Sequence, residues 1–254
     1  MFVVLGCPIY DRAWILPQWL ACIEQQDIGL ENLGFVFIGA PEDKETHDIL
    51  FEFQEKHPEL RCFDLTIDEK EEHRSHPEGQ RSWPRERYKA MARMRNLLLA
   101  RVNVHRPDRF LSLDSDMLLE NPRTISELAQ ITAVVDAASP LAYMTFQGIR
   151  FPNFMSWVTV PGGKAARLYD YPIGQLFKVD VIMATVMMNK LVYENTLYEW
   201  HRQGEDLGWS TDCFRKGFRL YSASYLYVPH IMSRGALDEY NKNGDPRREM
   251  VDSI

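Results

Sequence analysis

Short apolar runs alternate with amphipathic helical patterns through the first half of the chain, and this alternation narrows the range of folds more than any other feature. The apolar runs cover Phe2–Leu5, Gly34–Gly39, Leu60–Leu65 and Phe110–Leu113. Helical spacing of apolar side chains marks the segments 14–23, 47–56 and 88–102. Strands that alternate with helices pack into a mostly parallel sheet with helices on both sides. The sequence therefore predicts a single α/β domain of this architecture.

Composition disfavours several classes of protein. The chain has 254 residues, 45% of them hydrophobic, and can bury one full core. Its net charge of -7 disfavours a general binder of nucleic acid or of anionic membranes. The four cysteines lack Cys-x-x-Cys spacing, and no apolar run reaches the ~18 residues of a membrane span. We expect a soluble, cytoplasmic protein without a membrane span, whose thiols fill apolar space.

Two carboxylates, Asp114 and Asp116, follow the apolar run Phe110–Leu113. Open α/β sheets bind ligands at the carboxyl ends of their strands. Side chains two residues apart on a strand share a face, so two acids there repel each other unless a cation or proton lies between them. One interpretation is a Mg²⁺ or Mn²⁺ ion that carries substrate phosphates. The other is a solvated turn or a helix N-cap formed by Asp116 or Asn121.

The helix expected over 88–102 carries Arg95 within its apolar stripe. A guanidinium on a core-facing side needs a partner, which a diphosphate or the acid pair would supply. Alternatively, the side chain extends to solvent from the end of the helix. The stretch 81–109 is rich in arginine, which suits the phosphates of a nucleotide or of a nucleic acid. The charged segment 68–87 contains two prolines and a glycine and predicts a long loop.

In the second half, the run Lys178–Ala184 predicts a strand that enters a helix over Thr185–Tyr193. Glu205 and Asp206 precede a short helix, where acids are ordinary partners of the helix dipole. A later strand is predicted over 219–228, and a histidine follows it. Taken alone, that histidine is a surface or capping residue. It gains interest because the acid pair after the earlier strand lacks a nitrogen ligand.

The order of several of these segments along the chain is informative. The run Lys89–Asn96 precedes Phe110–Asp116, and a Gly-Glu-Asp at 204–206 and His230 follow. This order resembles the Ala-Arg-Asn helix, the Asp-x-Asp strand and the later motifs of GT-A fold glycosyltransferases. The resemblance covers about residues 2–232 and is greatest to compact members, namely the family-two type, the fungal mannosyltransferase type and bacterial or phage-encoded versions.

This resemblance implies a Rossmann-like GT-A domain with two functional halves. The domain would occupy residues 1–240, with a nucleotide-binding half over about 1–120 and an acceptor half over about 121–240. A polar tail would follow over 241–254. The residues that the resemblance assigns to the nucleotide sugar are Tyr10, Asp11, Asp43, Arg95, Asp114 and Ser115.

The resemblance also implies a metal site and a catalytic group. Asp116 would bind Mn²⁺ or Mg²⁺, with His230 as a further ligand. Asp206 would be the general base that removes the acceptor proton in an inverting enzyme, with Glu205 as the second choice for this role. In a retaining enzyme, Asp206 would only position the acceptor.

Three competing functions fit the sequence less well. A sugar-nucleotide pyrophosphorylase would carry a loop rich in glycine and arginine after the first strand, and Gly6–Tyr10 is not such a loop. A haloacid-type phosphatase would carry its Asp-x-Asp near the N-terminus, followed by Gly-Thr, whereas Met117 and Leu118 follow here. A nucleotide-sugar-binding module without activity would tolerate the loss of Asp116 or Asp206, and both are present. We therefore predict a metal-dependent hexosyltransferase that uses a UDP- or GDP-sugar.

The acceptor is less clearly indicated. Aromatic residues gather around Pro161–Lys164, where they suit a sugar ring or a nucleobase, or simply pack in the core. The candidate acceptor-binding residues are Trp157, Lys164 and Trp209. Ala184 and Thr185 stand where many relatives carry a glycine pair, which leaves the shape of the pocket open. The net charge favours a saccharide, and the arginine-rich stretch 81–109 keeps a hydroxymethylated base of phage-type DNA as the alternative.

Overall fold

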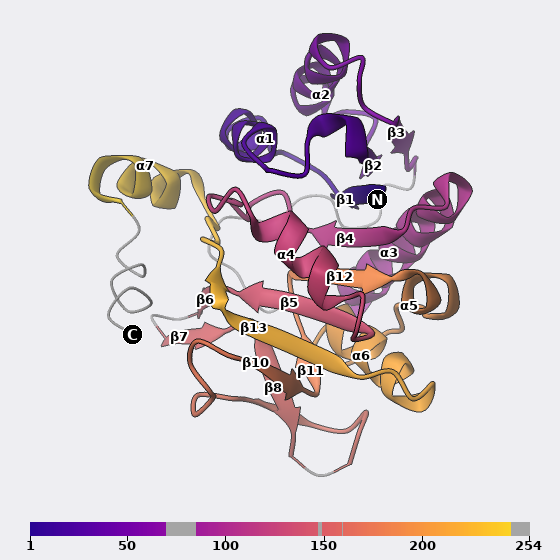
Figure 1. The fold of residues 1–254 in the computed structure, drawn as a ribbon, viewed down its shortest axis with the longest axis vertical. Helices are drawn as coiled ribbons and strands as arrows, with labels where there is room; N and C mark the ends of the chain where they lie inside the picture. The colour runs from indigo at the N-terminus through magenta and orange to yellow at the C-terminus, as the bar shows by residue number, and fades with distance from the viewer. Residues whose placement is uncertain (70–84, 147–148, 159, 245–254) are drawn as a thin grey trace.

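Four parallel strands and the helices between them form the first half of the fold (Figure 1). The computed structural model describes residues 1–69, 85–146, 149–158 and 160–244. The strands are β1 (Val3–Pro8), β2 (Leu33–Gly39), β3 (Cys62–Ile67) and β4 (Arg109–Leu113). The helices are α1 (Leu16–Glu24), the short 3-10 helix η1 (Leu30–Asn32), α2 (Lys44–Lys56) and α3 (Arg85–His105). The four strands predicted for this half are confirmed.

The second half adds strands of both directions to the same sheet. These strands are β5 (Ala137–Leu141), β10 (Leu176–Val179), β12 (Thr185–Asn189) and β13 (Leu220–Tyr227). The complete order is β10-β13-β5-β12-β4-β1-β2-β3. Strand β12 runs antiparallel to both β4 and β5, and β10 runs antiparallel to β13, whereas β5 and β13 are parallel. The predicted α/β fold with a mostly parallel central sheet is confirmed.

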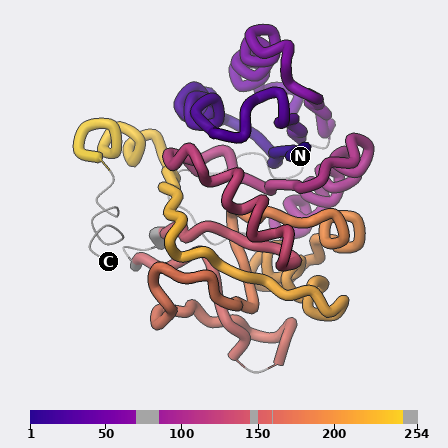
Figure 2. The backbone as a smooth tube through the Cα atoms, in the orientation of Figure 1, coloured from indigo at the N-terminus to yellow at the C-terminus, as the bar shows by residue number. Residues whose placement is uncertain are grey.

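Two small sheets and further helices complete the second half. The small sheets contain β6 (Tyr143–Phe146), β7 (Ile149–Pro152), β8 (Phe154–Trp157), β9 (Ala165–Arg167) and β11 (Val181–Ile182). The helices are α4 (Thr124–Ile131), α5 (Lys190–Asn195), α6 (Glu205–Arg215) and α7 (Arg234–Asn243). Figure 2 traces the yellow end of the chain along β13 and on to α7. Within the described ranges, no helix is long and apolar enough to cross a membrane.

Alternation of side chains along the strands builds a core on each face of the sheet. On one face, Leu5 of β1 packs in the same cluster as Trp19 of α1, and helices α2 and α4 contribute to that cluster. On the other face, Val4 of β1 lies in a cluster with Leu98 of α3, to which α5 and α6 contribute. A strand covered on both faces must be apolar throughout, which is why β1 reads as a continuous apolar run. The sheet is therefore the middle layer of three (Figure 1).

The segment that we predicted as a helix over Thr185–Tyr193 is mostly a strand. Its first five residues form β12, and α5 begins only at Lys190. The segment opens with β-branched Thr and Val and is buried over four consecutive residues, which suits a central strand between two partners. Asn189 then caps α5, because its side-chain oxygen accepts a hydrogen bond from the Val192 N–H at 3.1 Å.

Other predictions differ in extent from the structure. We did not predict α7, which takes in the start of the segment 241–254 that we expected to be a polar tail. Residues 245–254 of that segment, and residues 70–84 of the predicted loop 68–87, lie outside the described residues. The boundaries proposed for the domain and its two halves stay predictions. All four cysteines are free, and two of them are buried, as expected for thiols that fill apolar space.

Candidate active site

The loops that follow β1 and β4 border one cavity of about 1010 Å³. Helix α3, the small sheets and the start of α6 supply its other walls. This is the edge at which open parallel sheets bind ligands. The predicted site residues that line the cavity are Tyr10, Asp11, Arg95, Asp114, Ser115, Asp116, Lys164, Glu205, Asp206 and His230.

Asp116 and His230 form a largely buried pair. The Nε2 atom of His230 lies 3.2 Å from Asp116 Oδ1, and the two side chains are 5% and 13% exposed, respectively. Backbone hydrogen bonds hold the two segments together, from Ile231 N–H to the Asp116 carbonyl (2.8 Å) and from Leu118 N–H to the Pro229 carbonyl (3.0 Å). Burial opposes ionisation of Asp116, but its interactions with His230 and the nearby charge of Arg12 together outweigh burial and lower the carboxyl pKa to about 2. Asp116 is therefore an anion at neutral pH.

This pair offers two ligands to a divalent ion. Asp116 Oδ1 is buried and receives no well-directed hydrogen bond in the structure. The other carboxylate oxygen, Oδ2, lies 3.7 Å from Arg12 Nη2. Among the residues that the structure describes, no three His, Cys, Asp or Glu side chains gather to hold a metal by themselves. A carboxylate and an imidazole fit Mn²⁺ or Mg²⁺ if phosphate oxygens and water complete the coordination, as is common for these ions.

Arg95 is buried, with only 4% of its side chain exposed, so the alternative in which it extends to solvent is wrong. Its guanidinium donates to Asp114 Oδ1 at 2.8 Å and to Ser112 Oγ at 3.1 Å. Its Nε donates to Glu205 Oε1 at 3.3 Å, and the ring of Tyr198 lies 5.4 Å from the guanidinium carbon. Arg95 therefore ties the end of β4 to the start of α6 and braces Asp114.

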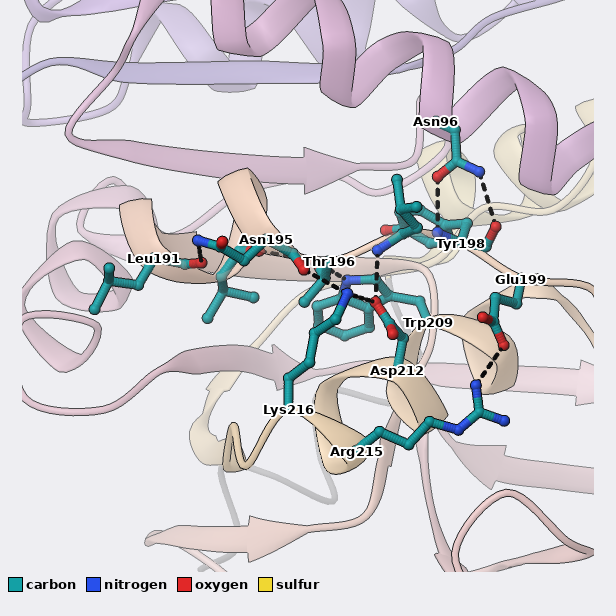
Figure 3. A network of polar contacts seen from close by, with 12 residues as sticks. Asn96, Leu191, Asn195, Thr196, Tyr198, Glu199, Trp209, Asp212, Arg215 and Lys216 are labelled. Carbon is teal, nitrogen blue, oxygen red and sulfur yellow. Dashed lines mark hydrogen bonds and ion pairs between the residues drawn. The ribbon is translucent and has the colours of Figure 1, made fainter.

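Asn96, the next residue of α3, fixes the backbone of the residue that stacks on Arg95. Its side-chain amide donates to the Tyr198 carbonyl at 2.8 Å, and its side-chain oxygen accepts from the Tyr198 N–H at 2.7 Å (Figure 3). Asp212 of α6, which Figure 3 also shows, accepts a hydrogen bond from the N–H of Leu197, the residue before Tyr198, at 2.8 Å. Helices α3 and α6 together therefore hold the segment that carries Tyr198.

Glu205 and Asp206 occupy the first turn of α6, and both line the cavity. Burial raises the pKa of Glu205, and the nearby charge of Arg95 opposes this rise. Burial and the neighbouring charge of Glu205 raise the pKa of Asp206 to about 8. Arg95 bonds directly to Glu205 and not to Asp206 in the described contacts. Asp206 is therefore the carboxyl that can gain and lose a proton near neutral pH.

Ala184 adopts a backbone conformation that favours glycine. Its φ angle is 69°, in the left-handed region that costs an ordinary residue roughly 1–2 kcal/mol. This is one of the two positions at which the sequence departs from the glycine pair of the family pattern. The Ala184 carbonyl accepts from the Asp114 N–H at 3.2 Å, and its backbone also hydrogen-bonds to Asp206. The bend therefore links the acid pair after β4 to Asp206.

The loop after β1 is held by a residue that does not itself line the cavity. Asp43, at the start of α2, accepts a hydrogen bond from the Asp11 N–H at 2.6 Å but is absent from the cavity wall. Its position therefore supports a bracing role for Asp43 and no direct contact with a bound ligand. Arg12 follows Asp11 in the loop after β1 and lines the cavity beside Asp116. We did not predict Arg12 as a site residue. Its position directly after Tyr10 and Asp11 was the available signal.

The candidate acceptor residues occupy different environments. Lys164 lines the cavity. Trp209 is only 1% exposed and donates from Nε1 to Thr196 Oγ1 at 2.9 Å, so its acceptor role is corrected to core packing. Trp157 of β8 is half-buried, packs near His201 and does not line the cavity. Lining residues that sequence reasoning missed include Arg87, Tyr88, Met91, Arg167, Gln203 and Arg234.

Residues 2–160 match the family model for the glycosyltransferase family 25 N-terminal domain. Because this match covers well over half of the chain, the chain belongs to that family of glycosyltransferases. The prediction of an enzyme of the glycosyltransferase class is confirmed at this level. No curated protein sequence matched the chain.

Solved structures share the fold at low sequence identity. The mannosyltransferase PcManGT from Pyrobaculum calidifontis, solved with GDP-Man and Mn²⁺, is 16% identical with a TM-score of 0.56. The alignment covers 92% of this chain and 58% of that one. TarS from S. aureus (residues 1–349), solved with UDP, is 16% identical with a TM-score of 0.57 over 94% of this chain and 63% of that one. The predicted GT-A fold is confirmed, and the chain spans about three fifths of each of these two structures.

The fold alone is shared by enzymes of more than one activity. The nucleoside-diphosphate-sugar pyrophosphorylase from Vibrio cholerae RC9 is 13% identical, with a TM-score of 0.51 over 95% of this chain and 98% of that one. The family match, and not this structural similarity, separates the present chain from a pyrophosphorylase.

Proposed function

We propose that the chain transfers a hexose from a nucleoside-diphosphate sugar to an acceptor hydroxyl in a reaction that depends on Mn²⁺ or Mg²⁺. The observation that carries this proposal is a carboxylate–histidine pair and a carboxyl with a raised pKa in the same cavity, at the carboxyl end of the sheet. The ligands of the similar structures support a nucleotide-sugar donor, since PcManGT was solved with GDP-Man and TarS with UDP.

The donor would lie across the ends of β1 and β4. Tyr10 and Asp11 would contact the nucleotide base and ribose, and Asp43 would hold the loop that carries them. Asp114 and Ser115 would contact the ribose or the sugar. Arg95 is already engaged by two carboxylates, so it would position Asp114 and leave the diphosphate to other groups.

Asp116 and His230 would hold the divalent ion. An aspartate carboxyl has an ordinary pKa of 3.8, so Asp116 is ionised at neutral pH, as a metal ligand must be. When bound, the ion would offset the negative charge that develops on the leaving nucleoside diphosphate. Arg12, within 3.7 Å of Asp116, would add a second positive charge at the same place.

Asp206 would act as the general base of an inverting transfer. It would accept the proton of the acceptor hydroxyl as that oxygen attacks the anomeric carbon and the bond from this carbon to the diphosphate breaks. A pKa of about 8 makes Asp206 a stronger proton acceptor than an ordinary aspartate, while leaving part of it ionised at neutral pH. We favour a saccharide acceptor because the chain carries a net charge of -7, with hydroxymethylated DNA as the alternative.

The proposal is tested by donor binding and turnover. Thermal unfolding is followed with UDP- and GDP-sugars, with and without Mn²⁺, and slow donor hydrolysis is followed by release of the nucleoside diphosphate. We expect one nucleotide class to raise the melting temperature more in Mn²⁺ than in EDTA. The change Asp116→Ala should abolish the Mn²⁺-dependent part of both signals.

A matched control is Asp238→Ala, which removes an exposed carboxylate of α7 that does not line the cavity. This variant should behave as the wild type. Wild-type rates in Asp116→Ala would place the metal elsewhere. Ligand stabilisation without any donor turnover would indicate a binding module, and release of pyrophosphate from a nucleoside triphosphate and a sugar 1-phosphate would indicate a pyrophosphorylase.

A further inference from the structure

The wall of the cavity that comes from the middle of the chain contains apolar and basic side chains but no acid. Its lining residues between positions 117 and 202 include Met144, Phe151, Met155, Lys164, Arg167 and Met183. No Asp or Glu among the described residues of that range lines the cavity. By contrast, the loops after β1 and β4 and the start of α6 contribute several carboxylates to the lining, Asp206 among them, and Gln203 just before α6 hydrogen-bonds to the backbone of Ala165 in β9.

The cations of the two walls differ in their partners. Arg12 lies 3.7 Å from Asp116, and Arg95 is bonded to carboxylates on β4 and α6. Lys164 and Arg167 have no ion pair within the described part of the chain. Arg167 is partly buried and has no carboxylate partner among the described residues, so its charge is left for water or an anionic ligand to satisfy, and Lys164 beside it is exposed to solvent.

Arg167 is also held in place. Its guanidinium carbon lies 3.4 Å from the centre of the Phe151 ring, and Phe151 is itself only 6% exposed. This cation–π contact orients a permanently charged group without neutralising it. Arg167 ends β9, which pairs only with β8 and forms an edge of its small sheet, and Lys164 directly precedes that strand. The two cations therefore border the cavity from one short edge strand.

We propose that Arg167 and Lys164 form an anion subsite for the acceptor, and that the acceptor is an acidic saccharide with a carboxylate on or beside the sugar that receives the hexose. This inference rests on the proposed function. The methionines would contact the apolar face of the sugar or its aglycone. Two cations match one carboxylate, whereas a long polyanion would have to approach a protein of net charge -7.

The subsite is tested with two probes that differ in one group, 4-nitrophenyl β-D-glucuronide and 4-nitrophenyl β-D-glucoside. Their dissociation constants for the full chain are measured by ligand-observed NMR at low salt. We expect the glucuronide to bind about tenfold more tightly, which is the size of one charge-assisted contact. The changes Arg167→Gln and Lys164→Gln should each reduce this preference, and the double variant should abolish it.

The control variant is Lys178→Ala, an exposed lysine of β10 that does not line the cavity, and it should keep the preference. Equal affinity for the two probes, or no binding of the glucuronide, would overturn the inference. So would equal losses of UDP and glucuronide binding in Arg167→Gln, because the cation would then serve the donor. Tighter, steeply salt-dependent binding of a hydroxymethylcytosine oligonucleotide would overturn the choice of an acidic saccharide.

Donor hydrolysis separates this inference from the proposed function. A chain that prefers the glucuronide but neither binds nor hydrolyses nucleotide sugars would refute the transferase and leave the anion subsite in place. A chain that hydrolyses the donor in Mn²⁺ but binds both probes equally would support the transferase and refute the subsite.

Discussion

The two walls of the cavity are built in opposite ways. On the wall formed by β1, β4 and the start of α6, charged groups already contact one another, as Arg95 does with Asp114 and Glu205. On the wall formed by the small sheets, Lys164 and Arg167 have no carboxylate partner in the described structure. The first wall is therefore arranged before any ligand arrives, and the second leaves its charge for a ligand to satisfy.

The backbone of the first wall is also held more firmly than the backbone of the second. Strands β1 and β4 lie inside the large sheet and are paired on both sides. The small-sheet strands are two to four residues long, and β9 is an edge. Flexible methionines line this wall and can adjust to the shape of a ligand. We call the wall formed by β1, β4 and the start of α6 the rigid wall, and the wall formed by the small sheets the adaptable wall. We infer that the rigid wall carries the chemistry and that the adaptable wall selects the acceptor.

The largest expected effect comes from the carboxyl that completes the rigid wall. Asp206→Asn removes the general base and should lower transfer by roughly 10²–10⁴-fold while donor binding stays unchanged. The rate of transfer and the donor dissociation constant measure the two effects separately. Loss of donor binding with unchanged transfer per bound donor would show that Asp206 is a structural cap of α6.

The same residue makes the wild type sensitive to pH. The base is active when ionised, so transfer should rise with pH and reach half its maximum near the Asp206 pKa of about 8. Stability should change in the opposite direction, because this pKa is raised from the ordinary value of 3.8. The contribution of protonated Asp206 is complete below about pH 4 and is lost as pH rises through about 8. Urea unfolding in EDTA should show this slope in the wild type and not in Asp206→Asn.

The next effect tests whether pairing on the rigid wall matters for folding. Arg95→Gln leaves Glu205 and Asp114 without their cation and should lower the free energy of unfolding by about 3–5 kcal/mol. Lys89→Gln is a matched control on the same helix, since Lys89 pairs with Glu86 at 3.1 Å and the two side chains are 42% and 56% exposed. We expect the control to lose less than about 1 kcal/mol. Equal losses in urea unfolding would contradict the contrast between the walls.

A smaller effect is expected where α3 holds the segment beside Arg95. Asn96→Ala removes both hydrogen bonds to the Tyr198 backbone and should cost about 2 kcal/mol of stability, roughly 1 kcal/mol for each bond. Asn195→Ala serves as the control, because Asn195 donates to the Leu191 carbonyl on the exposed surface of α5. The control should change stability by less than about 0.5 kcal/mol. Similar values for the two variants would show that Tyr198 is held by other contacts.

The smallest expected effect is a gain in stability. Ala184→Gly relieves the positive φ angle and should stabilise the chain by about 0.5–1 kcal/mol, because greater freedom of the unfolded chain offsets part of the relief. Ala165→Gly in β9 makes the same chemical change outside the positive-φ positions and should destabilise by about 0.5–1 kcal/mol. Melting curves in denaturant would decide. A loss of stability in Ala184→Gly would show that the bend carries no strain.

The contrast between the walls also explains what could be read from the sequence. Strands of the first half are buried on both faces, so runs such as Gly34–Gly39 are apolar throughout and easily recognised. Strand β12 is equally buried, but its two methionines favour helices, and a short apolar run does not reveal which element it forms. Helix α7 is so polar that its inner face is identified only by the packing of Leu237, Ala236 and Tyr240 against the core.

Pairs of site residues that are distant in the chain were predictable only through the family resemblance. No local pattern brings Glu205 next to Arg95 or His230 next to Asp116, because each contact depends on the order of strands in the sheet. Trp209 shows the opposite error. Its aromatic ring suits a sugar or a hydrophobic core equally well, and only tertiary packing decides between the two.

The backbone bridge between Met117 and His230 has a consequence for the synthesis of the protein. A growing chain emerges from the ribosome at about 5–20 residues per second, and its earlier segments can begin to fold first. Strand β4 and its acids can therefore take shape well before β13 brings His230 to Asp116. During that interval the nascent protein would present an acidic pocket that lacks its histidine. Competence to hold a divalent ion would thus arrive late, after most of the surrounding framework exists.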